Sequence, residues 1–167
     1  WSSDVCSSDL LQHSRHKIVI ISVSILVVIF ISFMSFTVLS LYKYQNTSAF
    51  MYQVTKIVPL PIAKVGGVFV PYEDYLFELR HYIHYFETQQ EVDFKSDEGK
   101  GQLVEQQKKS LDSVVDNAII KKIAREKKIT VSNDEVDQQI NLLRDQNRLG
   151  SDNKVFENVL SDYWGWS

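Results

Sequence analysis

An uncharged stretch at residues 18–42 constrains this chain more than any other feature of its sequence. An α-helix rises about 1.5 Å per residue, so the stretch would extend about 37 Å and cross a hydrocarbon core of about 30 Å. Its serine and threonine hydroxyls are tolerated there, because each can bond to a carbonyl one turn earlier. A buried helix of a globular protein is the alternative, but uncharged runs of this length are rare in that class. The sequence therefore predicts one transmembrane helix in a lipid bilayer.

The residues that flank this helix predict its orientation. Arg15 and Lys17 precede it and Lys43 follows it, so the positive-inside rule favours a cytoplasmic N-terminus. The apolar run is longer than the roughly 7–15 residues of a signal-peptide core, which favours an uncleaved anchor, although a weak cleavage site at residues 38–40 leaves cleavage open. We expect residues 13–42 to form a cytoplasmic stub and a single-pass anchor in the cell membrane, with the main domain extracytoplasmic.

Both ends of the chain are unusual. The chain begins with Trp1 instead of Met, and residues 1–12 have no helical or strand period and resemble a translated sequencing adapter. We therefore expect a non-native leader there. The one cysteine, Cys6, lies in this leader, which excludes an intramolecular disulfide and a multi-cysteine zinc site. Residues 163–167 carry aromatic side chains without an evident partner, and we expect a truncated domain at this end.

The distribution of charge argues against one class of function. With 18 Lys and Arg against 21 Asp and Glu, the formal net charge is −3, unlike a protein that binds nucleic acid by neutralising phosphates. Basic residues crowd between positions 121 and 128, and a nucleic-acid patch is one explanation for them. We favour the other, in which cations complement the negative end of a helix dipole, because the domain is acidic overall. The sequence thus predicts no nucleic-acid partner.

A stalk and a hairpin are predicted after the membrane helix. Polar residues followed by two prolines indicate a stalk over residues 43–61. Ile62–Val65 and Val68–Val70 flank Gly66-Gly67, which is the pattern of a β-hairpin with a two-residue turn. An isolated hairpin is marginally stable, and no later segment has a clear strand pattern. The hairpin therefore needs a third strand or a helix to pack against.

Apolar residues at three- and four-residue spacing predict four helices in the remainder. Pro71 opens the first, and the polar residues 91–101 connect it to a long helix over residues 102–128. A capping box at residues 132–135 starts the third helix, and Ser or Asp at 151–152 caps the last. The fold class is therefore mainly α, with one N-terminal transmembrane helix followed by a helical domain with a short β-hairpin. The buried face of the long helix is expected at Val104, Leu111, Val114, Val115, Ala118, Ile119 and Ile123.

The sequence does not assemble a catalytic, metal or cofactor site. His81 and His84 lie three residues apart on a predicted helix, but no acidic or histidine residue at helical spacing completes a metal site with them. Gly66-Gly67 is a turn and not a phosphate-binding loop. Four acidic residues are better explained as a solvated face and as helix caps than as paired catalytic carboxylates: Asp112, Asp116, Glu135 and Asp137.

Several segments resemble the N-terminal domain of SurA-type folding factors. Leu111–Ile120 is similar to the family's leucine- and aspartate-bearing helix, and Lys121–Asp137 is similar to the link and capping box that follow it. Ile62–Val70 resembles the family's first strand. The likeness covers about residues 62–160 in the correct order, and we expect the domain to occupy residues 62–167.

Two departures indicate a divergent member of this SurA/PrsA/PpiD-like family. Gly66 replaces an asparagine, and Lys128 stands where a glycine usually closes the helix. The resemblance implies an extracytoplasmic folding factor whose helical domain holds unfolded secreted or membrane polypeptides. Many members carry parvulin domains after this region, so a peptidyl-prolyl cis-trans isomerase is the enzymatic alternative. No parvulin sequence lies within these residues.

The helices also predict where a client polypeptide would bind. Apolar faces without a closing partner mark interaction sites, and aromatic rings with polar tips suit adaptable peptide contact. Burial of extended apolar segments along such faces would require neither ATP nor a cofactor. We expect about two-thirds of these residues in the core and the rest in a groove. The candidates are Tyr72, Tyr75, Leu76, Leu79, Ile83, Phe86, Val115, Ile119, Ile140, Leu143, Phe156 and Leu160.

Three functions therefore remain open from the sequence. The leading hypothesis is a membrane-tethered chaperone module, the second is a prolyl isomerase whose catalytic domain lies beyond these residues, and the third is a structural tether for one fixed partner. Crosslinking separates the first from the third, because a chaperone contacts many clients and a tether contacts one.

Overall fold

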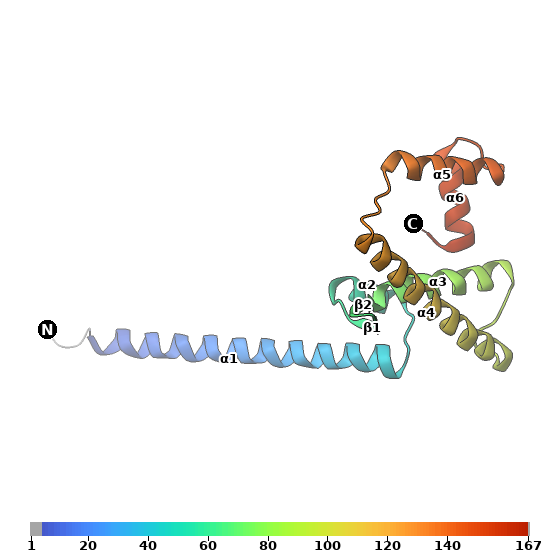
Figure 1. Cartoon of the computed structure of the whole chain (residues 1–167). Helices are drawn as coiled ribbons and strands as arrows, with labels where there is room; N and C mark the ends of the chain where they lie inside the picture. Colours follow the sequence, from blue (N-terminus) through green and yellow to red (C-terminus); the bar gives the residue numbers. More distant parts are fainter. Residues whose placement is uncertain (1–4, 167) are drawn as a thin grey trace. The chain divides into compact units, whose positions relative to one another are not determined.

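The computed structural model describes residues 5–166, and the side chains of residues 18–166, as two compact units divided between Asn46 and Thr47 (Figure 1). Trp1 to Asp4 and Ser167 lie outside the described residues. Of the leader predicted at residues 1–12, including Cys6, the structure therefore describes only backbone, from Val5 onward. Each unit is described by itself.

The first unit is helical from Val5 to Lys43. Helix α1 (Val5–Val38) continues into a short π-helix, η1 (Leu39–Lys43). The segment Ile18–Lys43 contains 26 residues, and its most apolar window of 18 residues has a mean hydropathy of 2.9. At about 1.5 Å per residue the segment is long enough to cross a membrane. Within residues 5–166 it is the one helix that is long and apolar enough, and a signal sequence near an N-terminus also meets these two requirements.

Hydroxyl groups in α1 bond to the helix backbone, as the sequence predicts. Ser24 Oγ donates to the carbonyl oxygen of Ile20 at 2.8 Å, and Thr37 Oγ1 donates to that of Phe33 at 2.9 Å. Each bond reaches back four residues and satisfies the hydroxyl within the helix itself. These side chains therefore need no outside partner in an apolar environment.

The second unit, Thr47–Ser167, contains five helices and a two-stranded antiparallel sheet within its described part. This composition confirms the predicted fold class, mainly α with one long apolar N-terminal helix and a short hairpin. The elements in chain order are α2 (Ala49–Ile57), β1 (Pro61–Val65), β2 (Val68–Pro71), α3 (Tyr72–Gln89), α4 (Asp97–Glu126), α5 (Asn133–Gln146) and α6 (Asn153–Trp164).

The hairpin forms where the two glycines predict it. Val65 pairs with Val68, and both intervening glycines have positive φ, 54° at Gly66 and 85° at Gly67, as a two-residue hairpin turn requires. Both strands pack against α3 and α4, so helices provide the support that an isolated hairpin lacks. Lys122 of α4 adds a hydrogen bond, donating from Nζ to the Gly66 carbonyl oxygen at 3.0 Å.

Helix α3 lies at the centre of the core. Four of its side chains are buried on one face, as the three- and four-residue spacing predicts: Tyr72, Tyr75, Leu76 and Leu79. Burial raises the pKa of Tyr75 to about 12. Helices α2, α4 and α6 and the hairpin all contact α3. The other buried apolar side chains of this unit are Met51, Val54, Val70 and Val114.

Helix α4 begins earlier than the sequence analysis predicts. Its first residue is Asp97, and Ser96 caps it by accepting from the Gly99 amide at 3.0 Å. The predicted polar connection over residues 91–101 is therefore too long, because residues 97–101 belong to the helix. Gly99 has a packing role there, since a Cβ at this position would overlap the carbonyl oxygen of Asp93.

The face of α4 that the structure buries differs from the predicted one. Val114 is buried as expected, but Val104 is 65% exposed, whereas Ser110 is fully buried. Ser113 Oγ donates to Glu78 Oε1 of α3 at 3.1 Å. Short polar side chains therefore contribute to the buried face of α4, a pattern that a search for apolar stripes misses. The remaining predicted face residues are half-buried or exposed: Leu111, Val115, Ala118, Ile119 and Ile123.

The sequence analysis did not predict α2, which lies within the expected stalk at residues 43–61. Ser48 caps this helix by accepting from the Met51 amide at 3.3 Å. Met51, Val54 and Thr55 are buried, and α2 packs against α3. The helix is only 9 residues long, too short for its apolar period to stand out beside the prolines that follow.

Helices α5 and α6 have well-formed ends but no buried residue. The predicted capping box is present: Ser132 Oγ accepts from the Glu135 amide, and Glu135 Oε2 accepts from the Ser132 amide at 2.7 Å. Hydrogen bonds from the Ser132 amide and hydroxyl lower the pKa of Glu135. Asp152 caps α6, one of the two caps expected there. Local bonds therefore define these two helices more than burial does.

Candidate functional site

The end of the chain packs its aromatic side chains on α3. The Trp164 ring stacks on Tyr85 with centroids 5.1 Å apart and an interplanar angle of 18°. The Trp166 ring lies 6.0 Å from Phe77 and 5.6 Å from His81. The expectation that these C-terminal aromatic residues have no partner is therefore wrong, because their partners lie about 80 positions earlier on α3.

The backbone at the end of α6 holds both tryptophans in place. Gly165 has a φ of 64° in the left-handed region, and its amide donates to the Ser161 carbonyl oxygen at 2.9 Å. His84 Nε2 donates to the carbonyl oxygen of Asp162 at 3.1 Å. Gly165 also lies against the His84 ring, so the two elements are in direct contact.

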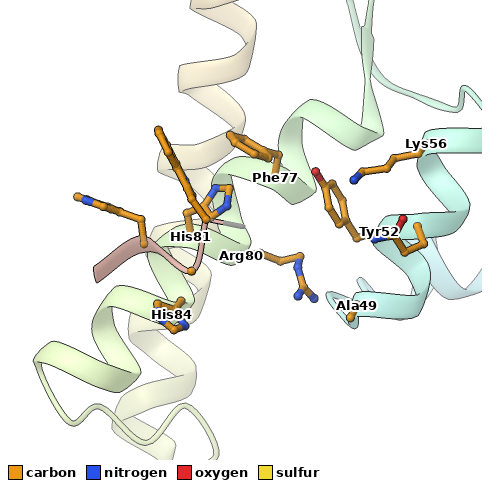
Figure 2. Close-up of a pocket in the computed structure, with 11 residues that line it drawn as sticks. Ala49, Tyr52, Lys56, Phe77, Arg80, His81 and His84 are labelled. Atoms are coloured by element: carbon orange, nitrogen blue, oxygen red, sulfur yellow. The ribbon is translucent and has the colours of Figure 1, made fainter. Parts of the chain in front are cut away.

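A cleft of about 410 Å³ opens between α2, α3 and the end of α6 (Figure 2). This size lies within the range of about 300–1,000 Å³ that is common for ligand sites. Aromatic and basic side chains make up most of its walls, and none of the lining residues is acidic. The lining residues are Ala49, Tyr52, Gln53 and Lys56 from α2, Phe77, Arg80, His81 and His84 from α3, and Trp164, Gly165 and Trp166.

Two cations approach the same ring inside this cleft. Lys56 Nζ lies 4.4 Å from the centre of the Tyr52 ring, and the Arg80 guanidinium carbon lies 5.7 Å from it. Figure 2 shows both side chains beside Tyr52. Arg80 Nη1 also donates to the Thr47 carbonyl oxygen at 2.7 Å. Within residues 18–166, no carboxylate lies within ion-pair distance of either cation.

His81 is neutral in this environment. Burial, and then the positive charges of Arg80 and His84, lower its pKa from 6.5 to about 4. Its ring packs edge-on against Phe77 with centroids 4.0 Å apart. The cleft therefore has a positive potential from Lys56 and Arg80, and His81 contributes an uncharged polar surface near pH 7.

A second feature is the exposed apolar surface of the last three helices and the link between α4 and α5. Large apolar side chains are exposed on each of these segments. The guanidinium of Arg144 in α5 stacks on the Phe156 ring of α6 at 4.4 Å, which connects the two helices. The large exposed apolar side chains are Val104, Ile119, Ile120, Ile123, Ile129, Val131, Val136, Leu142, Leu143, Val155 and Tyr163.

The structure divides the twelve candidate client-binding residues into three groups. Four are buried in the core and hold the fold together: Tyr72, Tyr75, Leu76 and Leu79. Six are half-buried: Ile83, Phe86, Val115, Ile140, Phe156 and Leu160. Two are exposed: Ile119 and Leu143. The four buried residues are closed to a ligand in the folded domain, so only the other eight can contribute surface.

The cleft was not predicted from the sequence. Tyr52 and Lys56 lie on the helix that was not predicted, and Arg80 lies outside the apolar stripe that the spacing predicts on α3. The pair of tryptophans at positions 164 and 166 was the available signal, because large aromatic residues are rarely left without packing. Among the side chains of residues 18–166, no three His, Cys, Asp or Glu residues gather as metal ligands would.

Comparison with known proteins identifies one family. A model of the SurA-like N-terminal domain matches residues 9–163. The matched region extends upstream of residue 62, where the resemblance seen in the sequence begins, and includes the apolar helix and α2. Comparisons with curated proteins and with solved structures find no match.

Proposed function

Because this chain belongs to the SurA-like N-terminal domain family, we propose that it is a membrane-tethered chaperone module that binds unfolded or extended apolar polypeptide segments. The family is one of folding factors, and its domain binds polypeptide substrates in general. In this chain the binding would occur outside the cytoplasm and without ATP. Clients would be secreted or membrane polypeptides.

The observation that carries the proposal is the apolar surface of α4, α5 and α6. Helix α5 buries no residue, and its two adjacent leucines are largely open to solvent: Leu142 is 48% exposed and Leu143 is 53% exposed. Exposed apolar area that a client covers contributes about 25 cal/mol per Å², so a few such side chains supply binding without any enzymatic chemistry. Helices α5 and α6 are capped at their N-termini, so they form while their apolar side chains remain exposed to solvent.

The tether rests on the first unit. Residues 13–42 supply the cytoplasmic stub and anchor, and the apolar segment is long enough to cross the bilayer with tilt. The second unit then lies on the far side of the membrane, since more basic residues precede the helix than follow it directly. Residues 62–167 carry the chaperone domain in this proposal.

The topology can be tested with single cysteines in a chain that carries Cys6→Ser. Asn147→Cys lies at the exposed end of α5, and Arg15→Cys lies before the membrane helix. A membrane-impermeant maleimide added to intact cells should label Asn147→Cys and leave Arg15→Cys unlabelled until the cells are opened. The opposite labelling pattern would reject the tethered extracytoplasmic arrangement.

The binding activity can be tested by light scattering from an unfolded client. The full chain, held in neutral detergent micelles without nucleotide, should suppress aggregation of a reduced, denatured protein. Leu142→Ser with Leu143→Ser should raise the concentration needed for half-suppression several-fold, because it removes exposed apolar area. Gln138→Ser with Gln139→Ser, also exposed on α5, is the matched control and should behave as the unchanged chain.

Equal suppression by the two double variants would show that α5 is not the binding surface. A photo-crosslinker at position 143 extends the test in cells. Many crosslinked polypeptides are expected for a chaperone, whereas one stoichiometric product would identify a tether for a fixed partner.

A further inference from the structure

The cleft between α2, α3 and the end of α6 holds positive charge that no acidic group of the described residues neutralises. Lys56 is exposed and contacts the face of Tyr52, and Arg80 is half-buried and donates a hydrogen bond to the Thr47 carbonyl oxygen. The two cations lie on different helices, so their positive field converges on the space between α2 and α3. A cleft lined by one sign of charge with apolar walls concentrates that field.

Aromatic rings in the walls of the same cleft provide a second basis for recognition beside the positive charge. Phe77 and Trp166 are 40% and 43% exposed, so their rings are open to contact beside the cations. Such rings pack on aromatic or apolar side chains with centroids about 4.5–7 Å apart. The complement of this cleft is therefore a carboxylate with a ring or an apolar side chain close to it, in a volume sufficient for one or two residues.

We propose that this cleft binds a carboxylate of a polypeptide segment, from an Asp or Glu side chain or from a chain terminus, with an adjacent aromatic side chain packed on Phe77 and Trp166. The proposal rests on the proposed function as a polypeptide-binding module and names the chemistry of one bound segment. Charge complementarity carries it, because two cations converge here and the cleft lining supplies no acid. A free inorganic anion would leave the aromatic walls uncovered.

The cleft offers its own spectroscopic readout. Of the three tryptophans in the sequence, Trp164 and Trp166 line the cleft, and Trp1→Phe removes the third. The test uses the full chain with this change in neutral detergent micelles. The probe is a blocked peptide, Gly-Ser-Phe-Asp-Gly-Ser, titrated while tryptophan fluorescence and peptide anisotropy are followed. Three comparison peptides are titrated in the same way. The first has Asn in place of Asp, the second has Ala in place of Phe, and the third is the Asn peptide with a free C-terminal carboxylate.

The Asp peptide should bind about five- to tenfold more tightly than the Asn peptide, and added salt should weaken the Asp peptide more. Recovery of affinity by the free carboxylate form would assign a chain terminus as an equivalent source. Lys56→Gln should reduce the preference for Asp to about twofold. This lysine is exposed and lies over the Tyr52 ring, so its loss should leave the fold intact. Lys154→Gln, an exposed lysine on α6 outside the cleft lining, should leave the preference unchanged.

Equal binding of the Asp and Asn peptides, or an unchanged preference in Lys56→Gln, overturns the proposal. Glycerol phosphate serves as a probe for an anionic lipid headgroup. If it quenches the cleft tryptophans in a Lys56-dependent way while the peptides do not bind, the cleft is a headgroup site and the proposal fails.

The aggregation assay separates this proposal from the proposed function. Suppression of aggregation without any Asp preference leaves the chaperone function standing and rejects the carboxylate site. An Asp preference without suppression of aggregation keeps the carboxylate site and rejects the chaperone function.

Discussion

The core around α3 and the pair of helices α5 and α6 are stabilised by different interactions. Helix α3 buries four apolar side chains against α2, α4 and the hairpin. Helices α5 and α6 bury no residue: both have capped ends, and α6 also stacks Trp164 on Tyr85 of α3. Helices of 14 and 12 residues are marginal in water on local bonds alone. The contrast teaches that one part of this domain fixes the fold, while the other part holds apolar surface open at low stability.

The largest test of this contrast compares one leucine from each region. Leu79 on α3 is fully buried, and Leu79→Ala should lower the free energy of unfolding by about 3 kcal/mol, because it removes buried methyl groups and leaves a cavity. Leu143→Ala on α5 should lower it by less than about 0.5 kcal/mol. Urea unfolding of the full chain in micelles, followed by tryptophan fluorescence, measures both. Equal losses would mean that α5 is part of the core.

A pair of glycines near the start of α4 gives the next largest effect. Gly99→Ala should lower stability by about 2 kcal/mol, because the new Cβ would overlap the Asp93 carbonyl oxygen and the backbone must move. Gly101→Ala, which has open space around it, should raise stability by about 0.5–1 kcal/mol through helix propensity. The same urea experiment applies. A loss in both variants would show that the overlap at Gly99 is not the cause.

Acid should loosen the contact between α6 and the core. The pKa of His81 is about 4 in the folded chain and about 6.5 when unfolded, so the unfolded state binds more protons between these values. His81 therefore contributes stability that is present above about pH 6.5 and is lost as the pH falls toward 4. Because its ring is only half-buried, we expect a loss of about 1 kcal/mol over this window.

The measurement for His81 is the pH dependence of tryptophan fluorescence and of unfolding in the Trp1→Phe chain. His81→Phe keeps an aromatic ring beside Phe77 and Trp166 but does not titrate, so it should flatten the profile between pH 7 and 5. An unchanged profile in this variant would assign the pH dependence to other groups.

The smallest effect lies at the junction of the two regions. Lys128 closes α4 with a φ of 55°, in the left-handed region, and the Ile129 amide donates to the Ala124 carbonyl oxygen at 2.9 Å. Lys128→Gly should raise stability by about 0.5–1 kcal/mol, since glycine adopts this backbone without strain. Lys127→Gly, at a φ of −85°, should lower it. Thermal unfolding compares the two, and a gain in both would contradict the explanation.

Part of the fold could be predicted because its causes are local. The apolar helix, the turn at Gly66-Gly67 and the capping box at Ser132 each depend on residues within a few positions of one another. The apolar period of α3 likewise predicts which of its faces is buried. The burial of α4 was predicted poorly, because Ser110 is fully buried and Ser113 bonds to Glu78 of α3, and short polar side chains do not belong to an apolar stripe.

The sequence by itself determined that this chain has an apolar segment long enough to span a membrane, a hairpin and a set of capped helices, since periodicity, glycine geometry and capping act over short distances. Only the tertiary structure decided that α2 joins the core and that Trp164 and Trp166 return to α3. It also decided that Lys56 and Arg80 meet in one cleft. Those arrangements depend on contacts between distant residues, such as His84 with Asp162, which no local pattern encodes.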